Sequence, residues 1–386
     1  MPTDLFCPRD RAQTRTLLEL PLQKTILLYM GRIDPYSKSD LFPLLLAYRN
    51  LWQKHPDKLL LLLVGPVNET YLPKLETLRQ ELGLPSHSLQ LRSNVAKGCV
   101  PLYYAAADLF VSLSDTLQEN FGLTPVEAMA SGLPVVVTDW AGYRESVKEG
   151  ETGFKVPTFW GPSDADLNEW APFYDWSFDH FYVGQSVGLD HQKLIEGLSL
   201  LVENEALRHQ MGERARAYAL QEYSWEVGVK RLWEAWVQLA KEAETLEDEM
   251  QKEDYRLLQP RYYETFGCFA SYGLSGAERL TITQRGLKVL KGQEPLGQIE
   301  EPRGLLKEEW VLRGLRGLRT LCRWSGSVSV ARLVELLRRC YGVNDSEGYR
   351  YVLWMLKYDL AALTCRPRSD LSQEILKSTG EGGFPT

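Results

Sequence analysis

The chain has 386 residues, of which 44% are hydrophobic and 11% aromatic, so it can build two or three domains with packed cores. Its formal net charge of −7 argues against a general affinity for nucleic acid. The 6 cysteines are scattered without a CxxC pair, which favours reduced thiols in a cytoplasmic protein over a disulfide framework or a zinc site. No signal-peptide pattern opens the chain, and its longest apolar run, 59–64, is too short to span a bilayer.

Residues 1–20 contain no pattern of a complete element. From there to residue 156, short apolar runs alternate with amphipathic segments, which predicts an α/β fold with a doubly wound, Rossmann-like parallel sheet. Strands are expected at 25–31, 59–65, 88–92, 108–113, 134–137 and 150–156. Helices are expected at 39–54, 71–82 and 101–107, with a loop and short helix at 139–145.

Two cations stand where the first strand gives way to a helix. Arg32 directly follows Gly31, and Lys38 lies further along the same loop. Ligands of such sheets bind at the carboxyl ends of the strands, and paired cations suit a diphosphate. The alternative is that both are ordinary surface charges on a loop.

The most informative segment is Glu119-Asn-Phe-Gly-Leu-Thr-Pro-Val-Glu127. We expect a turn at Gly122, a helix with Thr124 as N-cap and Pro125 as first residue, and Glu127 in the first helical turn. The free amides and positive dipole end of this helix would then lie between two carboxylates. That arrangement suits a phosphate flanked by hydroxyl-rich groups.

Glu119-x7-Glu127, with Phe-Gly-Leu-Thr inside it, resembles the E-x7-E element of retaining glycosyltransferases of family 4, which have the GT-B fold. The resemblance implies the C-terminal, nucleotide-sugar-binding domain of that fold over 21–243. Residues 3–10 resemble the linker that follows the family's first domain, so 1–20 are expected to be a linker remnant. The N-terminal, acceptor-binding domain is expected to be missing.

The resemblance also implies roles for individual residues. Arg32 and Lys38 would grip the donor diphosphate, and Glu127 would bind the ribose hydroxyls. Glu119 would hold the transferred sugar, and the loop at Arg92 and Ser93 would lie beside the base. No metal and no cofactor is implied, because the nucleotide-diphosphate sugar is a substrate. The implied donor-binding set is Gly31, Arg32, Lys38, Arg92, Ser93, Glu119, Phe121, Gly122, Leu123, Thr124 and Glu127, with Glu119, Arg32 and Lys38 also catalytic.

Residues 158–189 form an aromatic insertion without a clear period, which we interpret as a cover over the sheet rather than a sugar-reading surface. Helices are expected at 190–203, 205–223 and 225–243. In the family the last of these crosses back to the N-terminal domain. Without that domain it should expose apolar surface, as interfaces do.

A second unit follows a charged linker at 244–260. Residues 261–365 predict a small, mostly α-helical, winged-helix-like domain with helices at 305–324, 330–341 and 346–363. Its arginines at 313, 316, 319 and 323 share one helix face, which could meet nucleic acid or an acidic partner but is better interpreted as a solvated face. Residues 366–386 predict a disordered tail.

The resulting hypothesis is a retaining hexosyltransferase. It would move a sugar from a nucleotide-sugar donor to a hydroxyl of an acceptor sugar, lipid or small molecule, with a separate N-terminal GT-B domain as candidate partner. The alternative is a truncated, non-catalytic module that binds a nucleotide sugar or a partner. A DNA-binding regulatory tail is a third and weaker hypothesis. The sequence leaves the donor base, the sugar, the acceptor and the oligomeric state open.

Overall fold

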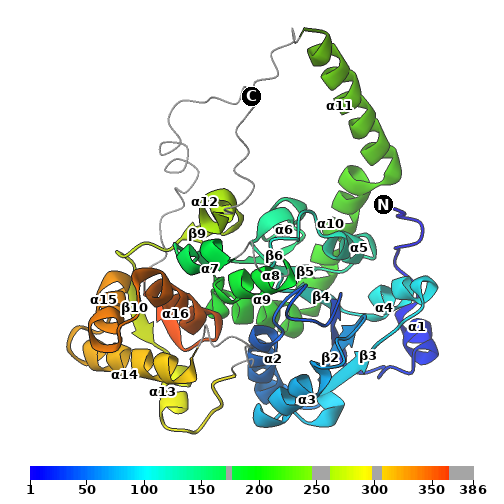
Figure 1. Cartoon of the computed structure of the whole chain (residues 1–386). Helices are drawn as coiled ribbons and strands as arrows, with labels where there is room; N and C mark the ends of the chain where they lie inside the picture. The colour runs from blue at the N-terminus through cyan, green and yellow to red at the C-terminus, as the bar shows by residue number, and fades with distance from the viewer. Residues whose placement is uncertain (171–175, 246–260, 298–306, 365–386) are drawn as a thin grey trace.

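The computed structural model describes residues 1–170, 176–245, 261–297 and 307–364 (Figure 1). Most of the predicted charged linker (246–260) and the whole predicted tail (366–386) lie outside these residues. No helix among the described residues is both long and apolar enough to cross a membrane.

A parallel sheet of 6 strands, in the order β3-β2-β1-β4-β5-β6, forms the centre of the fold, as the sequence predicts. Its strands are β1 (Thr25–Met30), β2 (Leu59–Val64), β3 (Leu89–Arg92), β4 (Leu109–Ser112), β5 (Val135–Thr138) and β6 (Gly153–Val156). The chain runs outward from β1 to β3 and then returns to place β4 on the other side of β1. The loops that follow β1 and β4 therefore diverge, which opens a crevice at this point of the sheet.

Helices cover both faces of the sheet, so alternate residues of each strand enter different cores. Leu27 and Tyr29 of β1 join the core under α2 (Phe42–Lys54) and α9 (His191–Glu203). Ile26, Leu28 and Met30 join the opposite core. That core packs α4 (Val100–Ala106), α5 (Leu123–Ala130) and α10 (Glu205–Tyr223). Because both faces are buried, β1 and β2 consist of uninterrupted apolar runs, as is typical of parallel strands.

Two further helices connect strands of this sheet, namely α3 (Leu72–Glu81) and α6 (Ala141–Ser146). The observed α2 begins three residues later than the predicted helix at 39–54, because the Asp40 carboxylate accepts the Phe42 amide at 2.9 Å and so ends the preceding loop.

The prediction that residues 1–20 contain no element is wrong, because α1 (Arg11–Leu17) lies there. Asp10 caps it by accepting the Gln13 amide at 2.8 Å. The helix is held by Arg15, whose guanidinium pairs with Asp108 at 2.6 Å and donates to the carbonyl of Ala106 at 2.9 Å. Both charged side chains are buried. A segment interpreted as a linker is thus docked on the domain.

The aromatic segment 158–189 is built from elements too short to show a period. They are β7 (Thr158–Trp160), α7 (Ala165–Trp170), α8 (Trp176–Gln185) and β8 (Gly188–Leu189). Strand β7 pairs with β8 and with β9 (Tyr272–Gly273) from the C-terminal part of the chain. Phe159, Trp160 and Phe181 are buried. The described part of this segment is therefore a packed layer and presents few aromatic side chains to solvent.

The C-terminal part contains helices around a small antiparallel sheet ordered β11-β10-β12. Its elements are α12 (Tyr262–Phe266), β10 (Arg279–Ile282), α13 (Gln284–Leu290), α14 (Glu308–Ser325), β11 (Val328–Ser329), α15 (Val330–Tyr341), α16 (Asp345–Lys357) and β12 (Ala361–Leu363). The predicted helix at 346–363 is too long at its C-terminal end. Asp359 adopts a left-handed conformation (φ 52°), which turns the chain and sends 361–363 into β12.

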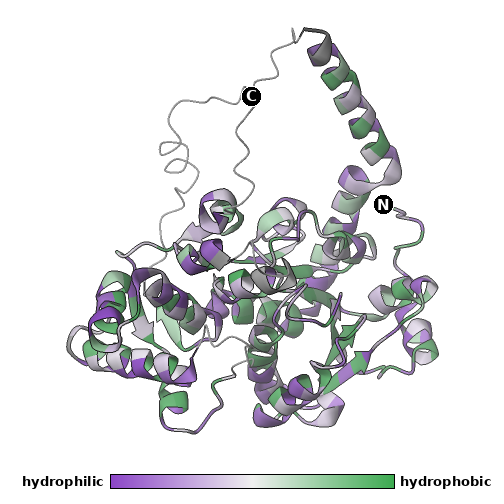
Figure 2. Ribbon diagram, in the orientation of Figure 1, coloured by the Kyte–Doolittle hydropathy of each residue, from purple (hydrophilic) through white to green (hydrophobic). Residues whose placement is uncertain are grey.

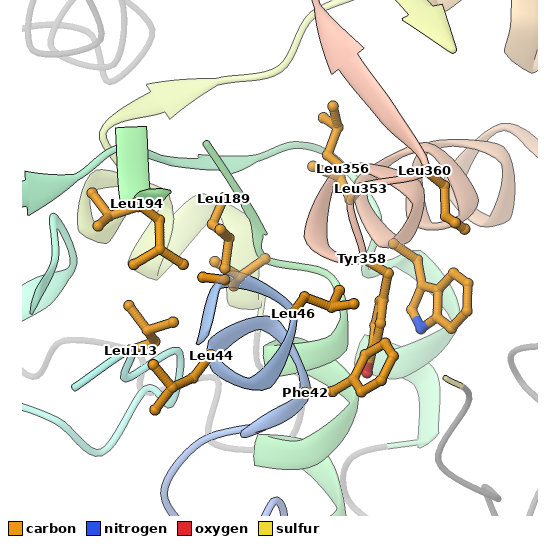
Figure 3. Close-up of a cluster of buried hydrophobic side chains, with 14 of the residues drawn as sticks. Phe42, Leu44, Leu46, Leu113, Leu189, Leu194, Leu353, Leu356, Tyr358 and Leu360 are labelled. Atoms are coloured by element: carbon orange, nitrogen blue, oxygen red, sulfur yellow. The ribbon is translucent and has the colours of Figure 1, made fainter. Parts of the chain in front are cut away.

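Helix α16 is buried on nearly every side, because it packs on its own unit and against β8 and α8. Figure 3 shows Leu353, Leu356 and Leu360 gathered beside Phe42 and Leu46 of α2. The core of the large domain therefore continues into the C-terminal part. In this arrangement most of α16 is covered by the rest of the protein.

Helix α11 (Trp225–Thr245) projects away from the body of the molecule (Figure 1). Its large apolar side chains are exposed, and Figure 2 shows the apolar bands along it. They are Trp225, Val229, Leu232, Trp233, Trp236, Val237 and Leu239. This confirms the prediction that the helix exposes apolar surface.

Candidate functional site

The candidate site lies at the carboxyl ends of β1 and β4. Two segments form it, and we name them the Lys38 loop (31–41) and the Glu119 loop (113–122). A pocket of about 180 Å³ lies between them. It is lined by Gly31, Arg32, Ser37, Lys38, Thr116, Gln118 and Glu119. The structure thus brings four of the sequence-predicted site residues around one small polar cavity.

An ion pair between Lys38 and Glu119 joins the two loops. Each side chain is only 11% exposed. The Lys38 ammonium also donates to the Tyr143 hydroxyl at 3.3 Å, and that hydroxyl lies 2.9 Å from Ser112 Oγ. Burial would lower the pKa of Lys38, but Tyr143 and Glu119 together raise it above its usual value. The Lys38 ammonium is therefore stabilised in its charged form beside Glu119 at the carboxyl ends of the strands.

Arg32 is exposed at the mouth of the pocket. Its guanidinium donates to the Ser37 carbonyl at 2.9 Å, which curls the Lys38 loop back on itself. The buried Tyr29 hydroxyl, in β1, donates to the Arg32 carbonyl at 2.9 Å. The remaining guanidinium N–H groups of Arg32 can reach an anion in the pocket.

Helix α5 begins at Leu123, so the prediction of Thr124 as N-cap and Pro125 as first helical residue is wrong. The cap is Gly122, in a left-handed conformation (φ 77°) where a Cβ would lie 2.1 Å from the Tyr143 ring. The helix can therefore start directly at the end of the Glu119 loop. Its first amides, at Leu123 and Thr124, have no partner within the helix.

Because α5 starts earlier, Glu127 lies in its second turn and not in its first. The Tyr104 hydroxyl of α4 donates to Glu127 Oε2 at 2.8 Å. Burial raises the pKa of Glu127, and the hydrogen bond from Tyr104 offsets part of that effect. The carboxylate is thus held in one orientation beside the amino end of α5.

Other sequence-predicted residues are not among those lining the pocket. Arg92 ends the edge strand β3, where its carbonyl accepts the Gly65 amide at 3.0 Å, and Ser93 is exposed beyond it. Phe121 is 44% exposed and its ring lies 5.6 Å from that of Tyr223. Leu123 is exposed as well. Gly122, Thr124 and Glu127 are not among the lining residues either.

Sequence reasoning missed three residues that orient the site, namely Tyr29, Tyr104 and Tyr143. Each lies in a strand or helix, and each is buried. Only their hydroxyl partners reveal the role, and no pattern in the sequence signals those partners. Among the described residues, no group of three or more His, Cys, Asp or Glu side chains lies close enough to hold a metal ion.

Asp115, in the Glu119 loop, is also buried and pairs with Lys357 of α16 at 2.7 Å. Burial raises the pKa of Asp115 to about 6, and Lys357 offsets only part of this rise. Between pH 4 and 6 the folded protein therefore keeps a proton that the unfolded chain releases. The contribution of this group to stability grows as the pH falls through that window and is lost as the pH rises.

When the pH is lowered from 7 to 4.5, we expect the free energy of unfolding of the wild type to rise by about 2 kcal/mol more than that of Asp115→Asn. The raised pKa of Asp115 is the reason, since a tenfold change in proton affinity is worth about 1.4 kcal/mol. Urea denaturation at both pH values measures this difference. Asp57→Asn, at an exposed carboxylate, should show no comparable change. An equal response of wild type and Asp115→Asn would mean that Asp115 titrates normally.

The large domain is similar in sequence to known proteins. Residues 10–166 match the model of the family "Glycosyl transferases group 1". The chain is 34% identical over 174 residues to a D-inositol 3-phosphate glycosyltransferase of Mycobacterium sp. (strain KMS), which covers 45% of this chain and 36% of that protein. It is 30% identical over 236 residues to the enzyme of the same name from Nocardioides sp., covering 58% and 43%. The chain thus spans less than half the length of these curated relatives.

Two solved structures are similar in part. One is the C-terminal domain of a glycosyl transferase group 1 family protein from Francisella tularensis, with 20% identity, a TM-score of 0.45 and coverage of 58% of this chain and 99% of that one. The other is the Anabaena protein Alr3699/HepE in complex with UDP and glucose, with 20% identity, a TM-score of 0.45 and coverage of 64% and 55%.

Proposed function

We propose that this chain, whose residues 10–166 match the group 1 glycosyltransferase family, binds the donor of a retaining sugar transfer, a nucleotide-diphosphate sugar, between the Lys38 and Glu119 loops. The observation that carries the proposal is the Lys38–Glu119 pair, which lies where the loops after the neighbouring strands β1 and β4 diverge. It places a cation and a carboxylate at the point where parallel sheets bind ligands.

In this proposal the diphosphate lies against Arg32, Lys38 and the first amides of α5. Negative charge develops on the departing diphosphate during transfer. Cations and amide dipoles aimed at that charge are the largest stabilising contribution that such a site can make. Lys38 is held in place by Tyr143, and the start of α5 by Gly122, so neither group needs to reorganise as the charge appears.

The two carboxylates would receive hydroxyl groups on either side of the diphosphate. Glu127, oriented by Tyr104, would accept from the ribose, and Glu119 from the transferred sugar. Carboxylates are strong acceptors for such hydroxyls. Arg92 and Ser93, at the end of β3, would lie toward the base. Phe121 would bound the opposite side of the sugar.

We propose that the acceptor half of the site comes from a further domain outside these 386 residues. The aligned regions cover 36% to 43% of the relatives compared above. The exposed tryptophans of α11 are a suitable contact surface for it, since aromatic residues are enriched in the buried centres of interfaces. The acceptor itself would be a hydroxyl of a sugar, lipid or small molecule. The free cysteines support a cytoplasmic location.

The second candidate function is a non-catalytic module that binds the nucleotide sugar or a partner. The exposed apolar face of α11 favours it, because that face needs a partner whether or not sugar is transferred. The first candidate function requires a working donor pocket, and the second requires either a donor pocket or a protein partner. Donor binding is therefore measured first. Transfer would then be sought with a supplied acceptor domain.

Calorimetric titration with UDP, GDP, ADP and their glucose or mannose conjugates tests the proposal. We expect saturable binding of one nucleotide, weakened about tenfold or more by Arg32→Ala and by Glu127→Ala, since each removes a charge-assisted hydrogen bond. Arg214→Ala, at an exposed position of α10, is the matched control and should bind as wild type does. Absence of binding to every one of these nucleotides would refute the donor-site assignment.

A further inference from the structure

The end of α16, in the C-terminal part of the chain, contacts both loops of the candidate donor pocket. Lys357 is the last residue of this helix and Tyr358 follows it. We propose that these two residues are positioning residues for the donor pocket, so that the C-terminal unit is an integral part of that site. The inference rests on the proposed function for the pocket's ligand. The contacts themselves are independent of it.

Tyr358 holds the Lys38 loop through Asp40. The Tyr358 hydroxyl donates to the Asp40 carboxylate and also lies 3.1 Å from Gln185 Oε1 of α8. Asp40 is buried, two positions after Lys38, and its other oxygen accepts the Phe42 amide at 2.9 Å. Asp40 therefore joins the end of the Lys38 loop, the start of α2 and the end of α16.

Lys357 holds the Glu119 loop through Asp115. Its ammonium donates to the Asp115 carboxylate at 2.7 Å and to the Gly184 carbonyl at 2.6 Å, and the side chain is only 1% exposed. Thr116, the next residue, lines the pocket. Its carbonyl accepts the Trp140 indole N–H at 3.0 Å. The base of the Glu119 loop is thus clamped between α16 and the loop after β5.

The two loops also contact each other directly. Ser114 Oγ lies 3.5 Å from the Lys38 carbonyl, and the Lys38–Glu119 pair spans the pocket. Consecutive residues of one helix end therefore set the positions of both halves of the pocket. A small rotation or shift of α16 would move Asp40 and Asp115 together and change the separation of Lys38 and Glu119.

Packing of the C-terminal part against the large domain does not require these polar contacts. Leu353, Leu356 and Leu360 already pack with Phe42 into one core (Figure 3). A buried ion pair adds little net stability over an apolar contact of the same volume, because both charges must leave water. What it adds is direction, since only one arrangement satisfies both partners. That is the property a positioning contact needs.

The test compares Lys357→Met and Tyr358→Phe with Arg350→Met in the full chain. Arg350 is the matched control, because it joins α16 to α7 by donating to Asp166 at 2.9 Å and to the Ser163 carbonyl at 2.8 Å, and its partners are in neither loop. Two quantities are measured for each variant. They are hydrogen exchange of the backbone amides in 31–41 and 113–122, and the affinity for whichever of UDP, GDP or ADP binds the wild type.

We expect Lys357→Met and Tyr358→Phe to speed amide exchange in both loops and to weaken nucleotide binding about tenfold or more, as small displacements of binding groups do. Lys357→Arg should restore part of the affinity. Arg350→Met should lower the melting temperature without either effect. Tyr358→Phe removes a single hydroxyl, so it decides the matter if Lys357→Met does not fold.

Unchanged exchange in both loops for Tyr358→Phe would overturn the proposal, as would an equal loss of protection in Arg350→Met. If the wild type binds none of the three nucleotides, the proposed function fails. The exchange measurement then still decides whether α16 positions the two loops.

Discussion

Asp108→Ala should lower the free energy of unfolding by about 3–5 kcal/mol, the usual cost of removing one partner of a buried ion pair. Asp108 Oδ2 accepts from Arg15 at 2.6 Å and from the Ile26 amide at 2.7 Å, and Oδ1 pairs with Arg11 at 2.9 Å. Its loss leaves the buried Arg15 guanidinium without a counter-charge and detaches α1 from the start of β4. Urea denaturation followed by circular dichroism measures the effect.

The control for this variant is Glu264→Ala. Glu264 is exposed in α12 and pairs with the exposed Arg261 at 2.8 Å, so its removal should cost no more than about 1 kcal/mol. A similarly small cost for Asp108→Ala would mean that α1 is not docked as the structure describes. Residues 1–20 would then behave as the linker that the sequence predicts.

Lys38→Met should weaken binding of the nucleoside diphosphate about 100-fold, toward the upper range for a lost hydrogen bond to a charged group. The substitution removes the one buried cation of the pocket and also leaves Glu119, which is 11% exposed, without its partner. The remaining negative charge would repel the diphosphate. Calorimetry with the nucleotide that binds the wild type measures the loss.

Lys155→Met is the matched control for Lys38→Met. Lys155 lies in β6 of the same sheet, where its ammonium donates to the Arg144 carbonyl at 3.3 Å and contacts neither donor loop. It should bind nucleotide as the wild type does. Equal affinity of Lys38→Met and wild type would place the diphosphate away from the Lys38 loop.

Local patterns in the sequence were sufficient for the central sheet. Each of the predicted strands appears within about one to three residues of its expected bounds. The inner strands β1, β2, β4 and β5 are predictable because a strand buried on both faces is mostly apolar, whereas the edge strands β3 and β6 are only partly buried. The loops that carry Arg32, Lys38 and Glu119 were predictable for the same reason. They follow β1 and β4, and parallel strands end at one edge of the sheet.

Element ends were less predictable, since they depend on contacts with other parts of the chain. Gly122 caps α5 because Tyr143 of α6 occupies the space where a Cβ would be. The N-cap of α1 is Asp10, a residue type that favours a helix start. A helix of 7 residues is nevertheless unstable alone, and α1 is stabilised here because Arg15 pairs with Asp108.

The parallel sheet, the Glu119-x7-Glu127 motif and the apolar face of α11 are predictable from the sequence, because each is encoded by residues near one another in the chain. Which polar groups hold the site in place depends on the tertiary structure. Asp115 and Lys357 are 242 positions apart, and Asp40 and Tyr358 are 318 apart. No local pattern specifies such pairs, because they form only when the core that continues from α2 into α16 has brought the two parts of the chain together.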